Sequence, residues 1–259
     1  MTATTAERGL WVREYSPAPD HGLTLVCFPH AGGGASAYRP LATALSRRAG
    51  VLSLQYPGRQ DRRTELPYTS VDALADDIAA TLLRQVAGPV VLFGHSMGAL
   101  VAYETARRLE RDGGAGPLGL VVSGARSAAE PRPRDVSLRS DAGIIDELRQ
   151  LDGTSAELLD DPEIQAMILP ALRADYTALE TYRHRPGLPL RCPVSAYVGD
   201  ADPQAGALDA ERWADLTSGT FRQRTFAGGH FFVDSARQQV AAALAEDLDA
   251  FAPDSRDPS

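Results

Sequence analysis

Short apolar runs that alternate with helix-like patterns are the feature that most constrains how this 259-residue chain folds. Nearly continuous apolar runs are typical of strands that are covered on both faces, and helical patterns between them are typical of crossover connections in a parallel sheet. We therefore expect a single α/β domain over 1–259, with a mostly parallel sheet and helices on both of its faces. The runs are 23–28, 51–55, 89–93, 118–123 and 193–198, and two further segments, 11–15 and 220–226, are predicted to be outer strands.

Three of the intervening segments carry the apolar spacing of an amphipathic helix. In 70–86 apolar residues recur every three or four positions, which predicts one buried stripe. Thr69, with Asp72 three positions later, predicts a loose form of the capping box at the start of this helix. Similar patterns predict helices over 97–111 and 234–251.

Composition excludes several classes of function. All 26 basic side chains are arginines, and the missing lysine excludes Schiff-base catalysis and the lysine-bearing phosphate loop. A net charge of −8 argues against a nucleic-acid-binding protein, which needs a basic face. Two cysteines, Cys27 and Cys192, are too few for a disulfide framework. The polar segment 1–9 lacks the apolar core of a signal peptide. No apolar run approaches the length of a membrane span. We therefore expect a cytoplasmic protein that has neither a membrane nor a nucleic acid as its partner.

The segment 125–190 interrupts the alternation of strands and helices. One apolar stripe lies within 144–151, and a second helix is predicted to begin at the Asp-Pro pair 161–162, a favourable N-cap and first-turn combination. Pro170 predicts a bend in this second helix. Helices inserted late in an α/β sheet often form a lid, so we expect a helical lid at about 130–185. A helical pair that only thickens the core is an equally open alternative.

The motif Gly-His-Ser-Met-Gly at 94–98 follows the apolar run 89–93 directly and leads into a helical pattern. A sharp strand-to-helix turn needs glycine on both sides, because side chains there collide with the strand or the helix. Such a turn lifts the serine hydroxyl above the edge of the sheet, and Ser96 is therefore predicted to be a nucleophile. The alternative is an ordinary glycine-rich turn with a capping serine.

A serine hydroxyl needs a base, and chain order selects among the five histidines. In an α/β-hydrolase the acid and then the histidine follow the serine along the chain. His230 lies in a Gly-Gly-His loop between the last predicted strand and the last helix, which places it at the carboxyl edge of the sheet. His184 falls among the inserted helices, and His95 belongs to the turn itself. His230 is the predicted base, and a surface-loop histidine is the alternative.

The acid is expected between the strand 193–198 and His230. Asp200 and Asp202 both follow this strand in the sequence Gly-Asp-Ala-Asp-Pro. A carboxylate tight against a strand end commonly caps a turn, whereas Asp202 lies further out and reaches an imidazole better. We prefer Asp202, whose role is to hold the histidine tautomer and to stabilise the imidazolium.

A tetrahedral oxyanion needs two backbone donors. The N–H of Met97, next to the nucleophile at a helix N-terminus, is one candidate. The loop 28–34, which reads Phe-Pro-His-Ala-Gly-Gly-Gly, supplies the other, because three consecutive glycines let backbone approach a substrate closely. We choose the N–H of Ala31. A flexible loop is one alternative, and a phosphate cradle is a weaker one because the rest of a nucleotide motif is missing.

Three further side chains are candidates for substrate binding. Arg59 follows a Pro-Gly turn, where a solvated arginine is the slightly favoured interpretation and contact with substrate is the other. Met167 and Tyr176 lie at helical spacing in the insert, so they either line the inner face of the predicted lid or simply pack in the core.

Five motifs occur in one order along the chain: Phe-Pro-His-Ala-Gly-Gly at 28–33, Tyr-Pro-Gly-Arg at 56–59, Gly-His-Ser-Met-Gly at 94–98, Gly-Asp-Ala-Asp at 199–202 and Gly-Gly-His-Phe-Phe at 228–232. Together they resemble the type II thioesterases, free-standing α/β-hydrolases that accompany modular polyketide and nonribosomal peptide synthases. The resemblance covers residues of roughly 20 to 250, and the combination is more specific than any single motif.

The resemblance implies a role for each candidate. Ser96 is the nucleophile, His230 the base and Asp202 its orienting acid, while the N–H groups of Ala31 and Met97 form the oxyanion hole. It implies that the inserted helices are a mobile lid and that no cofactor or metal takes part. The implied substrate is an acyl group on the phosphopantetheine arm of an acyl or peptidyl carrier protein, and the implied task is removal of stalled or wrong acyl groups.

Two other functions use the same residues. A carboxylesterase or acyltransferase carries the same triad, because a triad by itself does not distinguish an oxygen ester from a thioester. A ligand-binding protein that retains the hydrolase fold without turnover is the alternative outside the enzymes.

Overall fold

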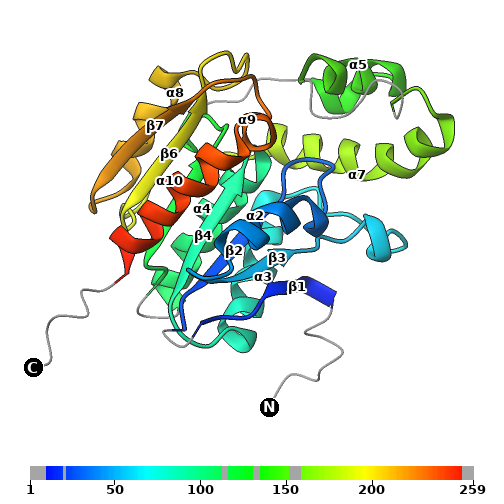
Figure 1. Ribbon diagram of the computed structural model, residues 1–259. Helices are drawn as coiled ribbons and strands as arrows, with labels where there is room; N and C mark the ends of the chain where they lie inside the picture. Colours follow the sequence, from blue (N-terminus) through cyan, green and yellow to red (C-terminus); the bar gives the residue numbers. More distant parts are fainter. Residues whose placement is uncertain (1–9, 20–21, 113–115, 131–134, 152–158, 253–259) are drawn as a thin grey trace, which may run out of the picture.

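The computed structural model describes residues 10–19, 22–112, 116–130, 135–151 and 159–252. The polar N-terminal segment 1–9 lies outside these residues, and so do 131–134 and 152–158 of the predicted lid region. Within them, one twisted sheet runs through the molecule with helices on either side (Figure 1).

The sheet has seven strands in the described part of the chain, in the spatial order β1-β3-β2-β4-β5-β6-β7. β1 pairs antiparallel with β3, and all other neighbours are parallel. Each predicted strand is present with its ends shifted by one or two residues, and the mostly parallel α/β sheet is confirmed. The strands are β1 (Val12–Ser16), β2 (Thr24–Phe28), β3 (Gly50–Leu54), β4 (Val90–His95), β5 (Gly119–Ser123), β6 (Val194–Gly199) and β7 (Phe221–Phe226).

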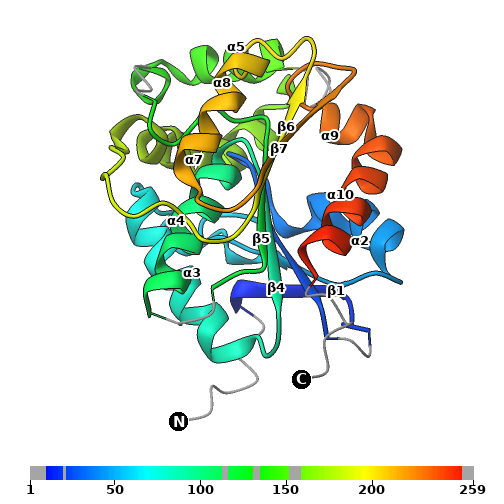
Figure 2. The ribbon, with the colours of Figure 1, turned by 90° about the vertical axis from the view of Figure 1, so that its left-hand side faces the viewer.

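Apolar side chains cover both faces of the sheet, as the continuous apolar runs predict. Because side chains alternate along a strand, Val26 and Leu92 pack on one face with α3 (Val71–Gln85) and α4 (Met97–Asp112). On the other face their neighbours pack with α2 (Arg39–Leu45) and α10 (Arg237–Phe251). Figure 2 shows the two helical layers on opposite sides of the sheet.

Two predicted helix boundaries are wrong. Ser70, rather than Thr69, caps α3: its backbone is extended and its hydroxyl accepts a hydrogen bond from the N–H of Ala73 at 3.3 Å. The predicted helix 234–251 is divided into α9 (Phe232–Ser235) and α10, because the backbone at Ala236 leaves the helical region. The short elements that complete the fold are η1 (Ala35–Tyr38), η2 (Gln60–Arg62), α8 (Ala207–Glu211) and η4 (Arg212–Leu216).

The insert consists of η3 (Val136–Leu138), α5 (Asp141–Leu151) and α7 (Pro162–Thr181), which lie together away from both termini (Figure 1). Asp161 caps α7 as predicted, and Pro170 lies inside one continuous helix. A third apolar cluster joins the two helices; Ile144, Ile145, Leu169, Leu172 and Tyr176 belong to it. The insert therefore has a small core of its own beside the main one.

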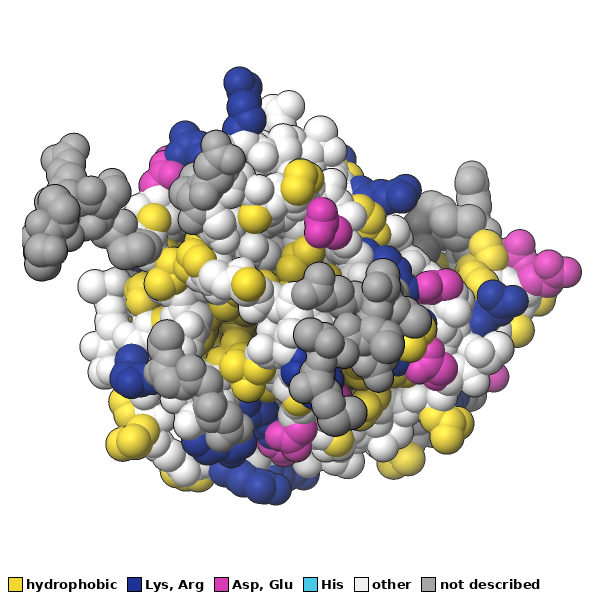
Figure 3. Space-filling view, turned by 90° about the horizontal axis from the view of Figure 1, so that it is seen from below, with side chains coloured by type: hydrophobic (Ala, Val, Ile, Leu, Met, Phe, Trp, Pro, Cys, Tyr) yellow, Lys and Arg dark blue, Asp and Glu magenta, His cyan; other side chains and the backbone are white. Residues whose placement is uncertain are grey.

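The face seen from below in Figure 3 carries acidic and basic side chains next to one another, with hydrophobic ones between them. In the ranges given above, no helix is long and apolar enough to cross a membrane.

Candidate active site

Ser96 lies in a strained turn between β4 and α4. Its φ of +55° is unusual for a residue other than glycine. Its N–H donates to the carbonyl oxygen of Ser123 on the neighbouring strand at 2.8 Å, which holds the turn against the sheet. A Cβ at Gly94 would overlap the backbone of Gly98, and a Cβ at Gly98 would overlap the carbonyl of Phe28. The two glycines of the motif therefore have the steric role that the sequence predicts for them.

Three side chains from three strand ends form one hydrogen-bonded chain. Nε2 of His230 lies 3.0 Å from Oγ of Ser96. Nδ1 of His230 lies 2.9 Å and 3.1 Å from the two carboxylate oxygens of Asp202. The side chains of His230 and Asp202 are almost fully buried, with exposed fractions of 1% and 0%. Hydroxyl, imidazole and carboxylate thus have the order and distances that a serine hydrolase needs.

The two aspartates that follow β6 have different partners. Oδ1 of Asp200 accepts the N–H of Gly228 at 2.9 Å, which ties together the loops after β6 and β7. Asp202 faces His230, and its Oδ1 also accepts the N–H of Gln204 at 2.8 Å. Asp200 therefore shapes the loop that carries His230, whereas Asp202 contacts the imidazole.

The loop after β2 lies next to the turn that carries Ser96, where a Cβ at Gly98 would overlap the carbonyl of Phe28. The N–H of Gly33 donates to the carbonyl of His30 at 2.9 Å and closes a tight turn, in which Gly32 has a φ of +73°. Within the described residues, the backbone N–H groups of Ala31 and Met97 have no acceptor in the protein. Both amides are therefore available to an incoming oxygen.

His95 and His30 surround this site with aromatic rings. The rings of His95 and His230 have centroids 5.2 Å apart, and His95 is completely buried. Burial, with the nearby charges of His230 and His30, holds the pKa of His95 well below its usual value. Burial, with His230 and Arg59 close by, lowers the pKa of His30 to about 4. Both rings are thus neutral at pH 7, and they do not add charge beside the imidazole of His230.

Comparison with known proteins assigns the chain to a family. The family described as "Thioesterase domain" matches residues 23–251, which is most of the chain. The chain belongs to the thioesterase family. This thioesterase has the α/β-hydrolase fold that the sequence predicts, and its resemblance to type II thioesterases is confirmed by the relatives below.

Two curated relatives come from Streptomyces. The chain is 48% identical over 241 residues to a "Probable cadicidin biosynthesis thioesterase" of Streptomyces griseus, covering 92% of this chain and 66% of that protein. It is 44% identical over 243 residues to "Thioesterase PikA5" of Streptomyces venezuelae, covering 93% of this chain and 86% of the relative. Among solved structures, the type II thioesterase BorB from the borrelidin biosynthetic cluster shares 46% identity with a TM-score of 0.86, over 92% of this chain and 98% of that one.

Arg59 differs from the favoured expectation for it. It is not solvated: the residue is 6% exposed, and one Nη lies 2.7 Å from Oδ1 of Asp175 on α7. Its other Nη donates to the carbonyl of Gly33 at 3.0 Å. A Pro-Gly turn is normally a surface feature, but here the arginine that follows it is buried against Asp175 of α7. Contact between Arg59 and substrate stays a prediction.

The two candidate residues of the insert, Met167 and Tyr176, lie in different environments. Met167 is 56% exposed, so the alternative that it packs in the core is wrong: the buried stripe of α7 passes through Leu169 and Leu172 instead. A place on the inner face of the lid, in contact with substrate, stays a prediction. Tyr176 is 6% exposed and packs in the small core of the insert, as the packing alternative has it. Sequence reasoning missed Asp175, although a single carboxylate on the stripe of Ala171 and Ala178 is a recognisable signal.

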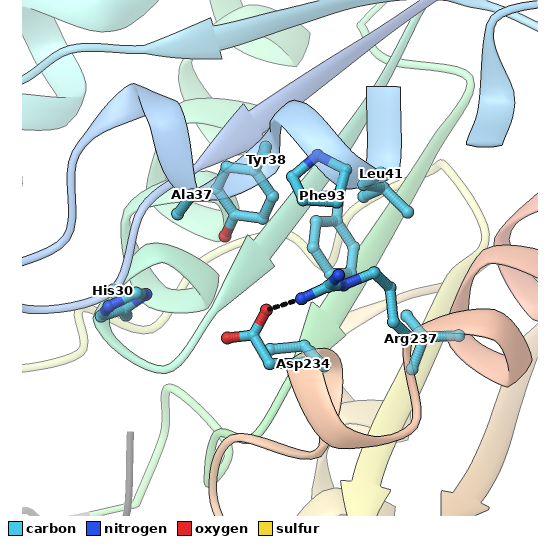
Figure 4. Close-up of a pocket in the computed structure, with 10 residues that line it drawn as sticks. His30, Ala37, Tyr38, Leu41, Phe93, Asp234 and Arg237 are labelled. Atoms are coloured by element: carbon cyan, nitrogen blue, oxygen red, sulfur yellow. Dashed lines mark hydrogen bonds and ion pairs between the residues drawn. The ribbon is translucent and has the colours of Figure 1, made fainter. Parts of the chain in front are cut away.

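A small pocket of this thioesterase lies behind His30, between η1–α2 and α9–α10 (Figure 4). Three of its polar side chains already have partners in the protein. The hydroxyl of Tyr38 donates to the carbonyl of Phe28 at 2.8 Å, and Arg237 pairs with Asp234 at 3.3 Å. We therefore assign no substrate to this pocket. In the described residues, no group of three or more His, Cys, Asp or Glu side chains is placed to hold a metal ion.

Proposed function

We propose that this thioesterase hydrolyses acyl thioesters on the phosphopantetheine arm of acyl or peptidyl carrier proteins, and so removes stalled or wrong acyl groups during polyketide or nonribosomal peptide synthesis. The chain of hydrogen bonds from Ser96 through His230 to Asp202 is the observation that carries this proposal. The names of the relatives support its setting, because they associate those proteins with antibiotic biosynthesis. Free thiols at Cys27 and Cys192 are consistent with a reducing cytoplasm.

Acylation is the first step. Oγ of Ser96 attacks the thioester carbonyl carbon while Nε2 of His230 takes the hydroxyl proton. The carbonyl oxygen becomes an oxyanion, which the N–H groups of Ala31 and Met97 stabilise. Asp202 stabilises the imidazolium that forms. The carbon–sulfur bond then breaks, the pantetheine thiol leaves with the proton from His230, and the acyl group stays on Ser96.

Deacylation repeats the chemistry with water. His230 removes a proton from water, the hydroxide attacks the acyl-serine carbonyl, and the same backbone amides stabilise the second oxyanion. His230 then returns a proton to Oγ of Ser96, which restores the enzyme and releases a carboxylic acid. These steps use only protein groups and water, so no cofactor takes part. We place α5 and α7 beside the acyl group as the wall and lid of its site.

The test follows acyl release from carrier proteins by intact mass. Wild-type protein is expected to unload acyl-carrier proteins, and Ser96→Ala is expected to lose at least about 1,000-fold in rate. A serine-reactive phosphonate is expected to add one label at Ser96 and none to the Ser96→Ala variant. Labelling of the variant contradicts the choice of nucleophile, and an unlabelled wild type points to a ligand-binding protein without turnover.

Two comparisons sharpen this test. Asp202→Ala is expected to lose far more turnover than Asp200→Ala, because only Asp202 contacts His230. The reverse order contradicts the assignment of the acid. Hydrolysis of an acyl-pantetheine thioester is then compared with that of an oxygen ester of equal chain length, and a clear preference for the ester indicates a carboxylesterase.

A further inference from the structure

The buried ion pair between Arg59 and Asp175 is the strongest feature that the proposed mechanism leaves unused. Nη2 of Arg59 lies 2.7 Å from Oδ1 of Asp175, and the side chains are 6% and 3% exposed. The two residues are 116 positions apart: Arg59 lies between β3 and η2, whereas Asp175 belongs to α7 of the insert. The pair therefore joins the insert to the α/β platform.

Both members of the pair also bind the loop that carries Ala31. Oδ2 of Asp175 accepts the N–H of Gly32 at 2.7 Å, and Nη1 of Arg59 donates to the carbonyl of Gly33 at 3.0 Å. A Cβ at Gly32 would lie 2.6 Å from the side chain of Leu172 on the same helix, so α7 packs directly on this turn. Side chains from two separate elements thus hold the first and the third of the peptide groups that follow Ala31.

The energetics favour a role in geometry over one in stability. A buried ion pair is weak evidence for stability, because removing two charges from water offsets most of their attraction, and hydrophobic residues of similar volume often serve as well. The hydrogen bonds to Gly32 and Gly33 are what such residues cannot reproduce. A displacement of about 1 Å in a catalytic group is enough to cost about 100-fold in rate.

We propose that Asp175 and Arg59 are positioning residues that set the orientation of the Ala31 N–H, so that α7 completes the oxyanion hole as well as covering the acyl site. This inference rests on the proposed function, in which Ala31 is an oxyanion donor. It makes the insert a part of the catalytic apparatus, and it gives a role to a charged pair that is buried where α7 meets the platform.

The experiment separates positioning from folding with three variants. Asp175→Asn removes the charge at nearly constant volume. Arg59→Met/Asp175→Leu removes both charges, so that no unpaired charge is buried and stability returns, but neither hydrogen bond to the loop is restored. Glu104→Gln is the matched control, because Glu104 forms a buried ion pair with Arg108 at 2.6 Å and contacts α7 through Tyr182, away from the loop.

We expect kcat of Asp175→Asn to fall about 10- to 100-fold while KM changes less than about twofold. The double variant is expected to regain the melting temperature of the wild type and to keep the low kcat. A trifluoromethyl ketone, to which Ser96 adds to give a tetrahedral oxyanion, is expected to bind more weakly by the same factor as kcat/KM falls. A non-hydrolysable acyl-pantetheine amide is expected to bind all variants equally.

Three results overturn the inference: a double variant with wild-type kcat, equal losses in Glu104→Gln, or an unchanged trifluoromethyl ketone affinity in Asp175→Asn. If the double variant does not fold, the ratio of the two inhibitor affinities in Asp175→Asn decides alone. A failure of the proposed function is seen separately, because wild-type protein then leaves acyl-carrier proteins loaded while the rates on a small activated ester still compare the variants.

Discussion

Two regions of the molecule, the turn that carries Ser96 and the helix α7, are held in place by different forces. The turn at 94–98 is fixed by backbone sterics: Gly94 and Gly98 leave no room for a side chain, and the N–H of Ser96 is bonded to the adjacent strand. The helix α7 is held by side chains. Its C-terminal half is tied to the platform by Asp175 and by Tyr182, whereas its N-terminal half packs on α5 and carries the exposed Met167.

Because of this difference, the turn at 94–98 is fixed by backbone sterics, whereas the loop 28–34 depends on side chains from distant parts of the chain. The steric need for glycine at positions 94 and 98 leaves a local sequence motif, although the atom that a Cβ at Gly98 would overlap is the carbonyl oxygen of Phe28 on a distant segment. A side-chain tie such as Asp175 to Arg59 joins segments more than 100 residues apart, and no motif marks Asp175. We therefore expect changes in the insert to alter the loop 28–34 and to leave the turn at Ser96 unchanged.

The largest expected effect is in the turn. Gly98→Ala is expected to lower the free energy of unfolding by more than about 3 kcal/mol, because the new methyl group overlaps the carbonyl of Phe28, a backbone atom that has no room to move. Urea unfolding followed by circular dichroism measures this. Gly206→Ala is the control, since its Cβ would have no neighbour closer than 3.7 Å. Equal stability of the two variants would show that the turn is not sterically fixed.

The halves of α7 are compared next. Leu172→Ala is expected to cost about 3 kcal/mol, because Leu172 is 1% exposed and fills the space over Gly32. Met167→Ala, five residues earlier, is expected to change stability by less than about 0.5 kcal/mol. The same urea measurement tests both. A large cost for Met167→Ala contradicts the view that the N-terminal half of α7 turns this side chain to solvent.

The second tie of α7 is expected to be weaker. Tyr182→Phe removes the hydrogen bond from the buried hydroxyl to Oε1 of Glu104, 2.8 Å long, and is expected to cost about 1 kcal/mol. The loss stays moderate because Glu104 keeps its ion pairs with Arg107 and Arg108. Thr181→Ala, at an exposed neighbouring position, serves as control. No difference between the two variants indicates that α7 does not depend on this contact.

The smallest expected effect is on the pH dependence of folding stability, through His95 in the turn at 94–98. Burial lowers the pKa of His95, so the unfolded state binds a proton near pH 6.5 while the folded state stays neutral. Folding stability therefore falls as the pH falls through about 6.5. The test variant is His95→Asn, which retains a polar atom toward Oγ of Ser123. Between pH 7 and pH 6 the free energy of unfolding is expected to fall less in this variant than in the wild type, and the difference between the two falls is under about 1 kcal/mol. Parallel curves of urea midpoint against pH contradict this.

The strands of the platform and the two helices of the insert were predictable from local patterns, whereas the contacts between insert and platform were not. Strand positions follow from apolar runs because burial on both faces leaves a continuous signature. The boundary errors at Thr69 and at Ala236 come from caps and single backbone angles, which side-chain patterns report poorly. The environment of Met167, which is 56% exposed, was left open because helical spacing shows that a helix has an apolar side without showing which neighbour covers it.

The sequence by itself determined the α/β sheet, the turn at Ser96 and the order of serine, acid and histidine, because each depends on residues that are neighbours in the chain or on the direction in which parallel strands run. Only the tertiary structure decided that Asp202 faces His230 while Asp200 ties two loops, and that Arg59 is buried under α7 against Asp175. The physical reason is that hydrogen bonds and ion pairs between distant segments depend on distances of a few ångströms, which folding sets and local sequence does not encode.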